Sequence, residues 1–373
     1  ELRVTIEYES ARFLNRRVGC GKLHLDLIDY PGEWLLDLPL MDLSFAAWCA
    51  EAGVEADRRP MDSASWRGLV AATDPLAPAQ ERTAKALAEE FTAYLKTARA
   101  DPNALASLPP GRFLMPGDME GSPALTFAPL ILPGDGPAPQ GSLWAMMERR
   151  FEAYKTHVVR PFFRDHFARL DRQIVLVDVL SAINGGPDAL DELQRALTSV
   201  LGSFRTGKLT FLGSLIDRRI EKVLFVATKA DHIHHTHHDR LEAILKHLVA
   251  DATKRAEFAG AQVDVAAMAA VRATREGTAT RGPDLLPTII GTPMAGERIN
   301  GRAFDGDKEI GLFPGDLPQD PETVFHAPRD DHAITTLRFR PGRIERSNAG
   351  LTLSLPHIRL DRVLQYLVGD RLA

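Results

Sequence analysis

Residues 222–231 read K-V-L-F-V-A-T-K-A-D, an apolar run that ends in a threonine, a lysine and an acid. A run without polar alternation is typical of a parallel strand that is covered on both faces. A second run of this kind, Q-I-V-L-V-D-V-L, covers residues 173–180. A helical stretch at 188–201 lies between the two runs, another at 239–257 follows the second, and residues 262–268 predict a further strand. This alternation predicts an α/β fold with a doubly wound, mostly parallel sheet.

In such sheets, ligands bind outside the carboxyl ends of the strands, where the second apolar run ends. There Thr228, Lys229 and Asp231 match a T-K-x-D variant of the guanine-recognition pattern N-K-x-D. The Asp231 carboxylate can accept two hydrogen bonds from the guanine edge, while the lysine stem packs on the base. Ala270 and Val271, after the third strand, stand where GTPases have a loop that touches guanine with backbone amides. Taken alone, Lys229 and Asp231 fit the start of a helix equally well.

The segment 29–33, D-Y-P-G-E, follows an alternating stretch at 23–28 that predicts a half-exposed strand. In GTPases an acid and a glycine at this spacing bind the metal ion and contact the phosphate. Asp29 would hold the Mg²⁺ shell through water, and the amide of Gly32 would face the γ-phosphate. Glu33 stands where many GTPases have a glutamine that orients water, and a carboxylate can orient or deprotonate water. The same letters also fit an ordinary turn with a capping acid.

A complete phosphate loop, G-x-x-x-x-G-K-[ST], does not occur in the sequence. Residues 19–23 lack the first glycine and the hydroxyl, and their lysine leads into a strand. Residues 202–208 have the glycines and the lysine, but Leu209 replaces the hydroxyl and a helix precedes them. Residues 2–8 alternate like 23–28 and predict an antiparallel pair at a sheet edge. We therefore expect a further strand beside this pair.

Three parts are predicted along the chain. Residues 1–33 plus 173–275 form a GTPase-like nucleotide-binding domain that lacks its first strand and phosphate loop. Residues 34–172 form a mostly helical insertion. Residues 276–373 form a small, loop-rich α+β subdomain with short strands near 335–339 and 351–355, and its last helix, about 358–368, is expected to pack on the nucleotide-binding domain.

The bulk composition favours an ordinary globular protein in a reducing compartment. The chain has 373 residues and a formal charge of -5, which gives no broad attraction for nucleic acid. Cys20 and Cys49 are expected to be unpaired thiols rather than a disulfide framework. No apolar run approaches the roughly 18 residues that a membrane span needs, and no signal peptide is recognisable at Glu1. We therefore expect a cytoplasmic protein, for which peripheral association with a membrane protein stays open.

Five histidines gather directly after the T-K-x-D pattern, at positions 232, 234, 235, 237 and 238. Their spacing on a helix start suits Zn²⁺. No cysteine or paired carboxylate nearby completes a site, although Asp231 and Asp239 flank the run. A solvated loop is therefore the favoured interpretation, with a metal-dependent hydrolase as the less favoured one.

Long segments of the chain resemble the bacterial YcjX-like family of P-loop, GTPase-like, stress-associated proteins. The segments that carry the resemblance lie at residues 29–39, 74–78, 110–113, 115–119, 171–178, 227–232 and 355–361. They span nearly the whole chain. Members of the family have a longer N-terminus that contains a strand and a phosphate loop, whereas this sequence starts at the next strand.

The resemblance implies a P-loop NTPase fold, GTP or GDP as ligand and Mg²⁺ as cofactor. We expect a slow GTPase that acts as a molecular switch in the stress response when a phosphate loop is present upstream. The helical insertion would contact a protein partner. The alternative is a non-catalytic scaffold or interaction protein with a GTPase-like fold.

Overall fold

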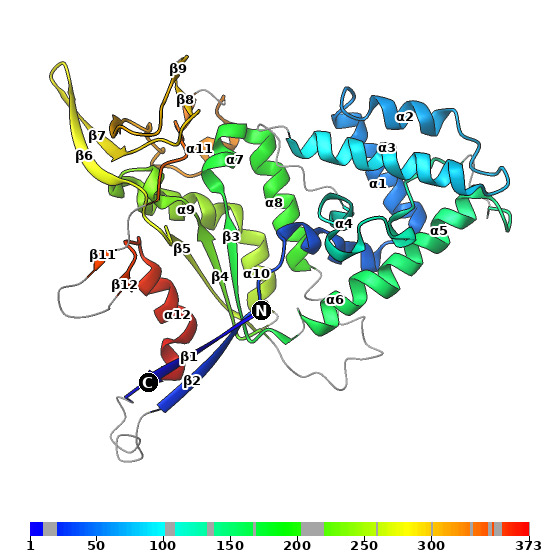
Figure 1. The fold of residues 1–373 in the computed structure, drawn as a ribbon, viewed down its shortest axis with the longest axis horizontal. Coiled ribbons are helices and arrows are strands. Elements are labelled where there is room, and N and C mark those ends of the chain that lie inside the picture. Colours follow the sequence, from blue (N-terminus) through cyan, green and yellow to red (C-terminus); the bar gives the residue numbers. More distant parts are fainter. Residues whose placement is uncertain are drawn as a thin grey trace. The chain divides into compact units, whose positions relative to one another are not determined.

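The computed structural model describes residues 1–9, 21–100, 109–132, 138–166, 169–202, 220–258, 260–299, 301–328, 331–341, 345–346 and 353–372. Contacts divide the chain into two compact units, and Figure 1 shows their elements. The first unit takes in residues 1–27, 171–194 and 220–373, and the second takes in 28–170 and 195–219. Each unit is thus built from segments that are distant in the sequence.

A three-stranded parallel sheet forms the centre of the first unit. Its order is β3-β4-β5, from Arg172–Val177, Lys222–Ala227 and Gln262–Ala267. Lys222 of β4 lies opposite Arg172 on one side and Gln262 on the other. The three predicted strands and their parallel pairing are confirmed, and the chain has a mixed α/β fold.

Helices connect and cover these strands. They are α7 (Val179–Gly185), α8 (Pro187–Gly202, whose first half belongs to this unit), α9 (His238–Leu248), α10 (Ala250–Phe258) and α12 (Leu360–Leu372). The single helix expected at 239–257 is wrong, because α9 ends at Leu248 and Val249 separates it from α10. The last helix packs on the sheet, where Val363 and Leu367 join a buried cluster with Leu224 and Val226.

β4 is buried on both faces, but β3 is not. Ile174 and Leu176 are 42% and 63% exposed. They are paired with Leu224 and Val226, so they share the face on which α12 packs. The expectation that β3 is covered on both faces is therefore wrong for the described residues, because α12 leaves Ile174 and Leu176 exposed, although its Asp370 pairs with Arg172 at the start of β3.

Antiparallel pairs make up the rest of the first unit. β1 (Leu2–Tyr8) pairs with β2 (Gly21–Leu27). The predicted antiparallel pairing is confirmed, but among the described residues the pair forms a separate two-stranded sheet and not the edge of a larger one. β6 (Arg275–Arg281), β7 (Asp284–Gly291) and β10 (Ile310–Leu312) form a sheet in the order β10-β7-β6. This sheet corrects the sequence interpretation, which made the segment loop-rich.

The smaller elements are β8 (Arg298–Ile299), β9 (Arg302–Ala303), α11 (Thr323–His326), β11 (Glu345–Arg346) and β12 (Leu353–Ser354).

The later strand predictions are only partly correct. Residues 335–339 are not a strand, and Phe339 makes a single bridge to Pro293. Of the strand expected at 351–355, Leu353–Ser354 is present as β12, while 351–352 lie outside the described residues.

The second unit is mainly helical. Its helices are α1 (Phe45–Arg58), α2 (Ala64–Ala71), α3 (Glu81–Ala100), α4 (Gly111–Leu114), α5 (Leu143–Tyr154) and α6 (Arg160–Asp165), with a π-helical turn at Lys155–Val159. The helix expected near 79–99 is confirmed. The one expected near 143–168 is present from Leu143 to Asp165 with the π-helical turn inside it, and residues 167–168 lie outside the described residues. In the described part of the chain, no helix is both long and apolar enough to cross a membrane.

Aromatic rings fill the core of this unit. Trp48 stacks on Phe151 with ring centroids 5.0 Å apart, and both are buried. Cys49 beside them is a free, buried thiol, and burial raises its pKa to about 12. Cys20 lies outside the described residues.

Candidate functional site

The T-K-x-D segment directly follows β4 and is held against the neighbouring strand. The Thr228 amide donates to the Val177 carbonyl at 3.0 Å, and the threonine hydroxyl approaches the same oxygen at 3.3 Å. Lys229 takes the left-handed conformation, with φ 60° and ψ 32°. A non-glycine residue in this region is uncommon, so the loop turns sharply just after the strand.

Lys229 forms an ion pair with the acid that ends β3. Its ammonium lies 2.5 Å from Oδ2 of Asp178. Asp178 also caps α7 by accepting from the Ser181 amide at 3.1 Å and from the Ser181 hydroxyl at 2.8 Å. Burial alone would raise the pKa of Asp178, but the hydrogen bonds from Lys229 and Ser181 bring it below its ordinary value. Asp178 thereby stays ionised and holds Lys229 at the end of the sheet.

Asp231 is buried, with 5% exposure, and joins the loop after β4 to the loop after β5. Its Oδ2 accepts from the Ala273 amide at 2.8 Å, and its main-chain carbonyl accepts from the Thr274 hydroxyl at 2.5 Å. Ala270 and Val271 lie earlier in that second loop and are exposed. The structure thus brings the predicted guanine-contacting segments together.

The D-x-x-G segment belongs to the second unit. Asp29 and Gly32 are exposed, and Gly32 begins a 3₁₀ segment that runs to Asp42. Glu33 is largely shielded and forms an ion pair with Arg99 of α3. Gly111 lies so close that a Cβ there would stand 1.8 Å from the Glu33 carbonyl oxygen, so only glycine fits.

Sequence reasoning missed a buried acid a few residues further along this segment. Asp37 accepts hydrogen bonds from the Tyr154 hydroxyl at 2.6 Å and from the Gly111 and Arg112 amides at 2.7 and 3.3 Å. Burial raises the pKa of Asp37 to about 6, and these hydrogen bonds oppose that rise. The acid anchors the 3₁₀ segment in the helical unit.

The histidine run is not a solvated loop. His234, His237 and His238 are 9%, 5% and 4% exposed. His237 pairs with Asp316 at 3.0 Å, and Nε2 of His238 donates to the Ala230 carbonyl at 2.9 Å. Burial lowers the pKa of all three rings, which keeps them neutral near pH 7.

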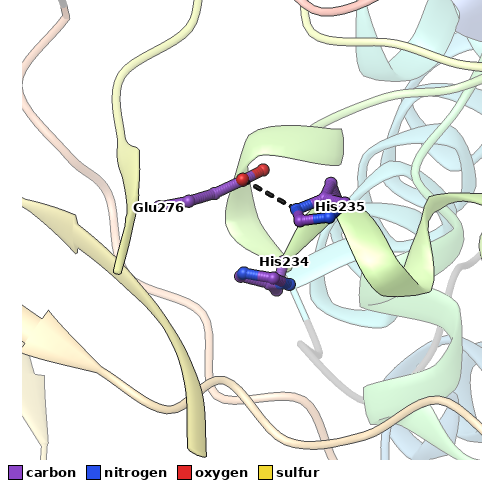
Figure 2. Close-up of side chains that lie close together, drawn as sticks. All are labelled: His234, His235 and Glu276. Carbon is purple, nitrogen blue, oxygen red and sulfur yellow. Dashed lines mark hydrogen bonds and ion pairs between the residues drawn. The ribbon is translucent and has the colours of Figure 1, made fainter. Parts of the chain in front are cut away.

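Two neighbouring histidines lie close to a carboxylate that sequence reasoning did not select. His235 Nδ1 lies 2.7 Å from Oε2 of Glu276 on β6, and the centroids of the His234 and His235 rings are 4.3 Å apart. Figure 2 shows the three side chains, with the contact between His235 and Glu276 dashed. One donor atom from each of the three side chains lies within 4.8 Å of the others. Glu276 was missed because it is 41 residues from His235, in a segment expected to be loop.

The two segments that only partly match a phosphate loop, 19–23 and 202–208, extend beyond the described residues. Gly21 and Lys22 open β2, while residues 19–20 lie outside the described residues. Gly202 ends α8, and residues 203–219 lie outside the described residues.

Comparison with known proteins agrees with these motifs. The YcjX-like family, DUF463, matches residues 1–372. The chain is 35% identical over 381 residues to the "Ras-like GTPase YcjX" of Escherichia coli K12, a match covering 100% of this chain and 78% of that protein. It is 31% identical over 383 residues to the "Ras-like GTPase YcjX" of Shewanella oneidensis MR-1, covering 100% and 76%. The chain therefore belongs to the YcjX-like family of GTPase-like proteins.

Proposed function

We propose that the protein binds guanine nucleotide with Mg²⁺ and hydrolyses GTP slowly, as a molecular switch in the bacterial stress response. The observation that carries this proposal is the T-K-x-D loop, in which Asp231 is fixed at the carboxyl end of β4 beside the loop of Ala270 and Val271. Binding outside the carboxyl ends of parallel strands is the rule for α/β sheets. The names of the relatives support GTP as the ligand.

Guanine recognition would use the Asp231 carboxylate. Its Oδ2 is occupied by one backbone amide, but a carboxylate has about four lone-pair sites. Both oxygens therefore keep capacity for the N1–H and N2–H groups of guanine. Asp178 would hold Lys229 so that its stem lines the base, while Thr228 fixes the loop to β3.

The metal ion and the γ-phosphate would be bound by the D-x-x-G segment. Asp29 and Gly32 are exposed and open to ligand. Mg²⁺ keeps several waters and needs few protein ligands, so one carboxylate is chemically adequate. Glu33 would orient the attacking water once its carboxylate is released from Arg99, and this requirement supports a slow rate.

Nucleotide specificity provides the experiment. In the full-length protein, we expect Asp231→Asn to lose GTP affinity by at least about tenfold and to gain affinity for XTP, because the xanthine C2 carbonyl accepts where guanine donates. Fluorescent-nucleotide displacement measures both. Asp251→Asn, which changes an exposed acid paired with Lys254, is the matched control. Unchanged GTP binding by Asp231→Asn would refute the assignment.

A second candidate function is that of a non-catalytic, GTPase-like scaffold. The Glu33–Arg99 ion pair favours it, because the only carboxylate proposed to orient water is already engaged. Single-turnover hydrolysis distinguishes the two. GTP binding with no hydrolysis above the rate of free GTP in the same buffer would select the scaffold.

A further inference from the structure

The histidine and glutamate cluster of Figure 2 joins two parts of the first unit that are far apart in sequence. His234 and His235 lie at the 3₁₀ turn that precedes α9, and Glu276 lies on β6. Two imidazoles and a carboxylate are a common protein ligand set for zinc when water takes the fourth position. Mg²⁺ prefers oxygen ligands, so this donor set differs from the one proposed for the nucleotide's metal.

The spacing of the donors suits a metal ion. In a tetrahedral zinc site with bonds of roughly 2.0–2.2 Å, neighbouring donors stand roughly 3.3 Å apart. The His235 nitrogen and the Glu276 oxygen are 2.7 Å apart and share a proton. A metal ion would replace that proton and move the two atoms slightly outward. With donors within 4.8 Å of one another, the cluster needs only small side-chain rotations to close.

Two of the three side chains can rotate toward an ion, and the third is held in position by a neighbouring residue. His235 and Glu276 are 60% and 31% exposed at their side chains, so they can rotate. His234 is nearly buried, and its Nδ1 lies 3.0 Å from the Thr236 hydroxyl. The Thr236 amide also donates to this Nδ1, at 3.5 Å, so the His234 ring is held in place by its own turn. Arg272 lies 3.6 Å from Oε1 of Glu276, the oxygen that does not contact His235.

We propose that His234, His235 and Glu276 bind a divalent transition-metal ion of the Zn²⁺ class, with water completing the coordination. The ion would act as a clip between the start of α9 and β6. The same two segments are already linked where Asp231 accepts hydrogen bonds from Ala273 and Thr274. The clip would therefore stiffen the connection between the loop after β4 and the small antiparallel sheet.

Zinc binding to the full chain without a histidine tag tests the proposal. Competition with a chromogenic chelator gives stoichiometry and affinity, and the visible spectrum of the Co²⁺ form reports the coordination number. We expect one equivalent per chain and a tetrahedral Co²⁺ spectrum. Glu276→Gln is expected to weaken binding by at least about tenfold. His235→Gln should do the same, and Zn²⁺ at one concentration should raise the Tm of wild type more than that of either variant.

Two controls separate this site from adventitious binding. Glu309→Gln breaks another exposed ion pair of the same sheet, with Arg275, and His326→Gln removes an exposed histidine on α11. Both should bind zinc like wild type. Zinc affinity that is equal in wild type, Glu276→Gln and His235→Gln, or an octahedral Co²⁺ spectrum, would overturn the proposal. Neither readout needs nucleotide, so the result is independent of GTP binding.

Discussion

Asp37 shows how a single buried acid ties the D-x-x-G segment to the helical unit. It is 2% exposed, yet it receives three hydrogen bonds, from the Tyr154 hydroxyl and from the amides of Gly111 and Arg112. A buried carboxylate without such donors would cost several kcal/mol. The donors come from positions 74 to 117 residues away in sequence, so this anchor exists only in the folded protein.

The raised pKa of Asp37 predicts a specific pH dependence of stability. Its value is about 6 in the folded state, against about 3.9 when unfolded, so the folded state binds more protons between these values. The contribution is fully present below pH 3.9 and is lost as pH rises through 6. From pH 5 to pH 7 we expect the free energy of unfolding to fall by about 1 kcal/mol through this group.

Comparison with Asp37→Asn isolates the effect. Denaturant unfolding of both proteins at pH 5 and pH 7 should show the extra loss in wild type only. Asp118→Asn, which changes an acid that is 90% exposed beside Arg112, should behave like wild type. An equal pH response of wild type and Asp37→Asn would contradict the raised pKa.

Arg99 and Glu33 give a second prediction at this scale. Arg99→Met should raise single-turnover GTP hydrolysis by up to about fivefold, because Arg99 is 45% exposed at its side chain and a solvent-screened ion pair contributes about 1 kcal/mol. Lys96→Met, one turn earlier on α3 and also exposed, is the control. A slower rate in Arg99→Met would instead give Arg99 a role in stabilising the transition state.

Among the elements, those with a regular apolar pattern were predictable from sequence. β4 is apolar after Lys222 and α12 is amphipathic, and both are present. The β6–β7 hairpin was not predicted because β6, R-E-G-T-A-T-R, has no alternation of apolar residues. The available signal was its turn, where Gly282 has φ +63° between paired Arg281 and Asp284. Glycine there suits a two-residue hairpin loop.

Packing of α12 on the sheet can be tested with two leucines of that helix. Leu367 is 6% exposed and contacts the cluster of Leu224 and Val226, whereas Leu364 is 47% exposed. Leu367→Ala should destabilise the first unit by about 2–4 kcal/mol, because it leaves a cavity. Leu364→Ala should cost less than about 1 kcal/mol. Thermal unfolding measures both, and equal losses would mean that α12 does not pack as described.

At the scale of the whole molecule, some candidate site residues belong to the first unit and others to the second. Asp29, Gly32 and Glu33 belong to the second unit, and the first unit contributes Thr228, Lys229, Asp231, Ala270 and Val271. The sequence located all of these motifs. It missed Asp37, Glu276 and Arg99, because each is made relevant by a contact with a residue far away in the sequence.

This division predicts that nucleotide state changes the helical unit. The 3₁₀ segment Gly32–Asp42 starts in the D-x-x-G motif and buries Leu38 and Leu40 in the helical core. We propose that a change in this segment transmits the presence or absence of the γ-phosphate to a surface that contacts a protein partner. Hydrogen exchange of residues 34–172 should be slower with a GTP analogue than with GDP. Identical exchange in both states would exclude the relay.

The sequence by itself determined the parallel sheet, the main helices, the family and the motifs at 29–33 and 228–231, because each depends on neighbours within one strand, turn or helix. Only the tertiary structure decided which charges those motifs meet. It placed Arg99 on Glu33, Asp178 on Lys229, and Glu276 beside the two histidines. The physical reason is that ion pairs and buried hydrogen bonds depend on distance in space, and residues tens to more than a hundred positions apart come within 3 Å only when the chain is folded.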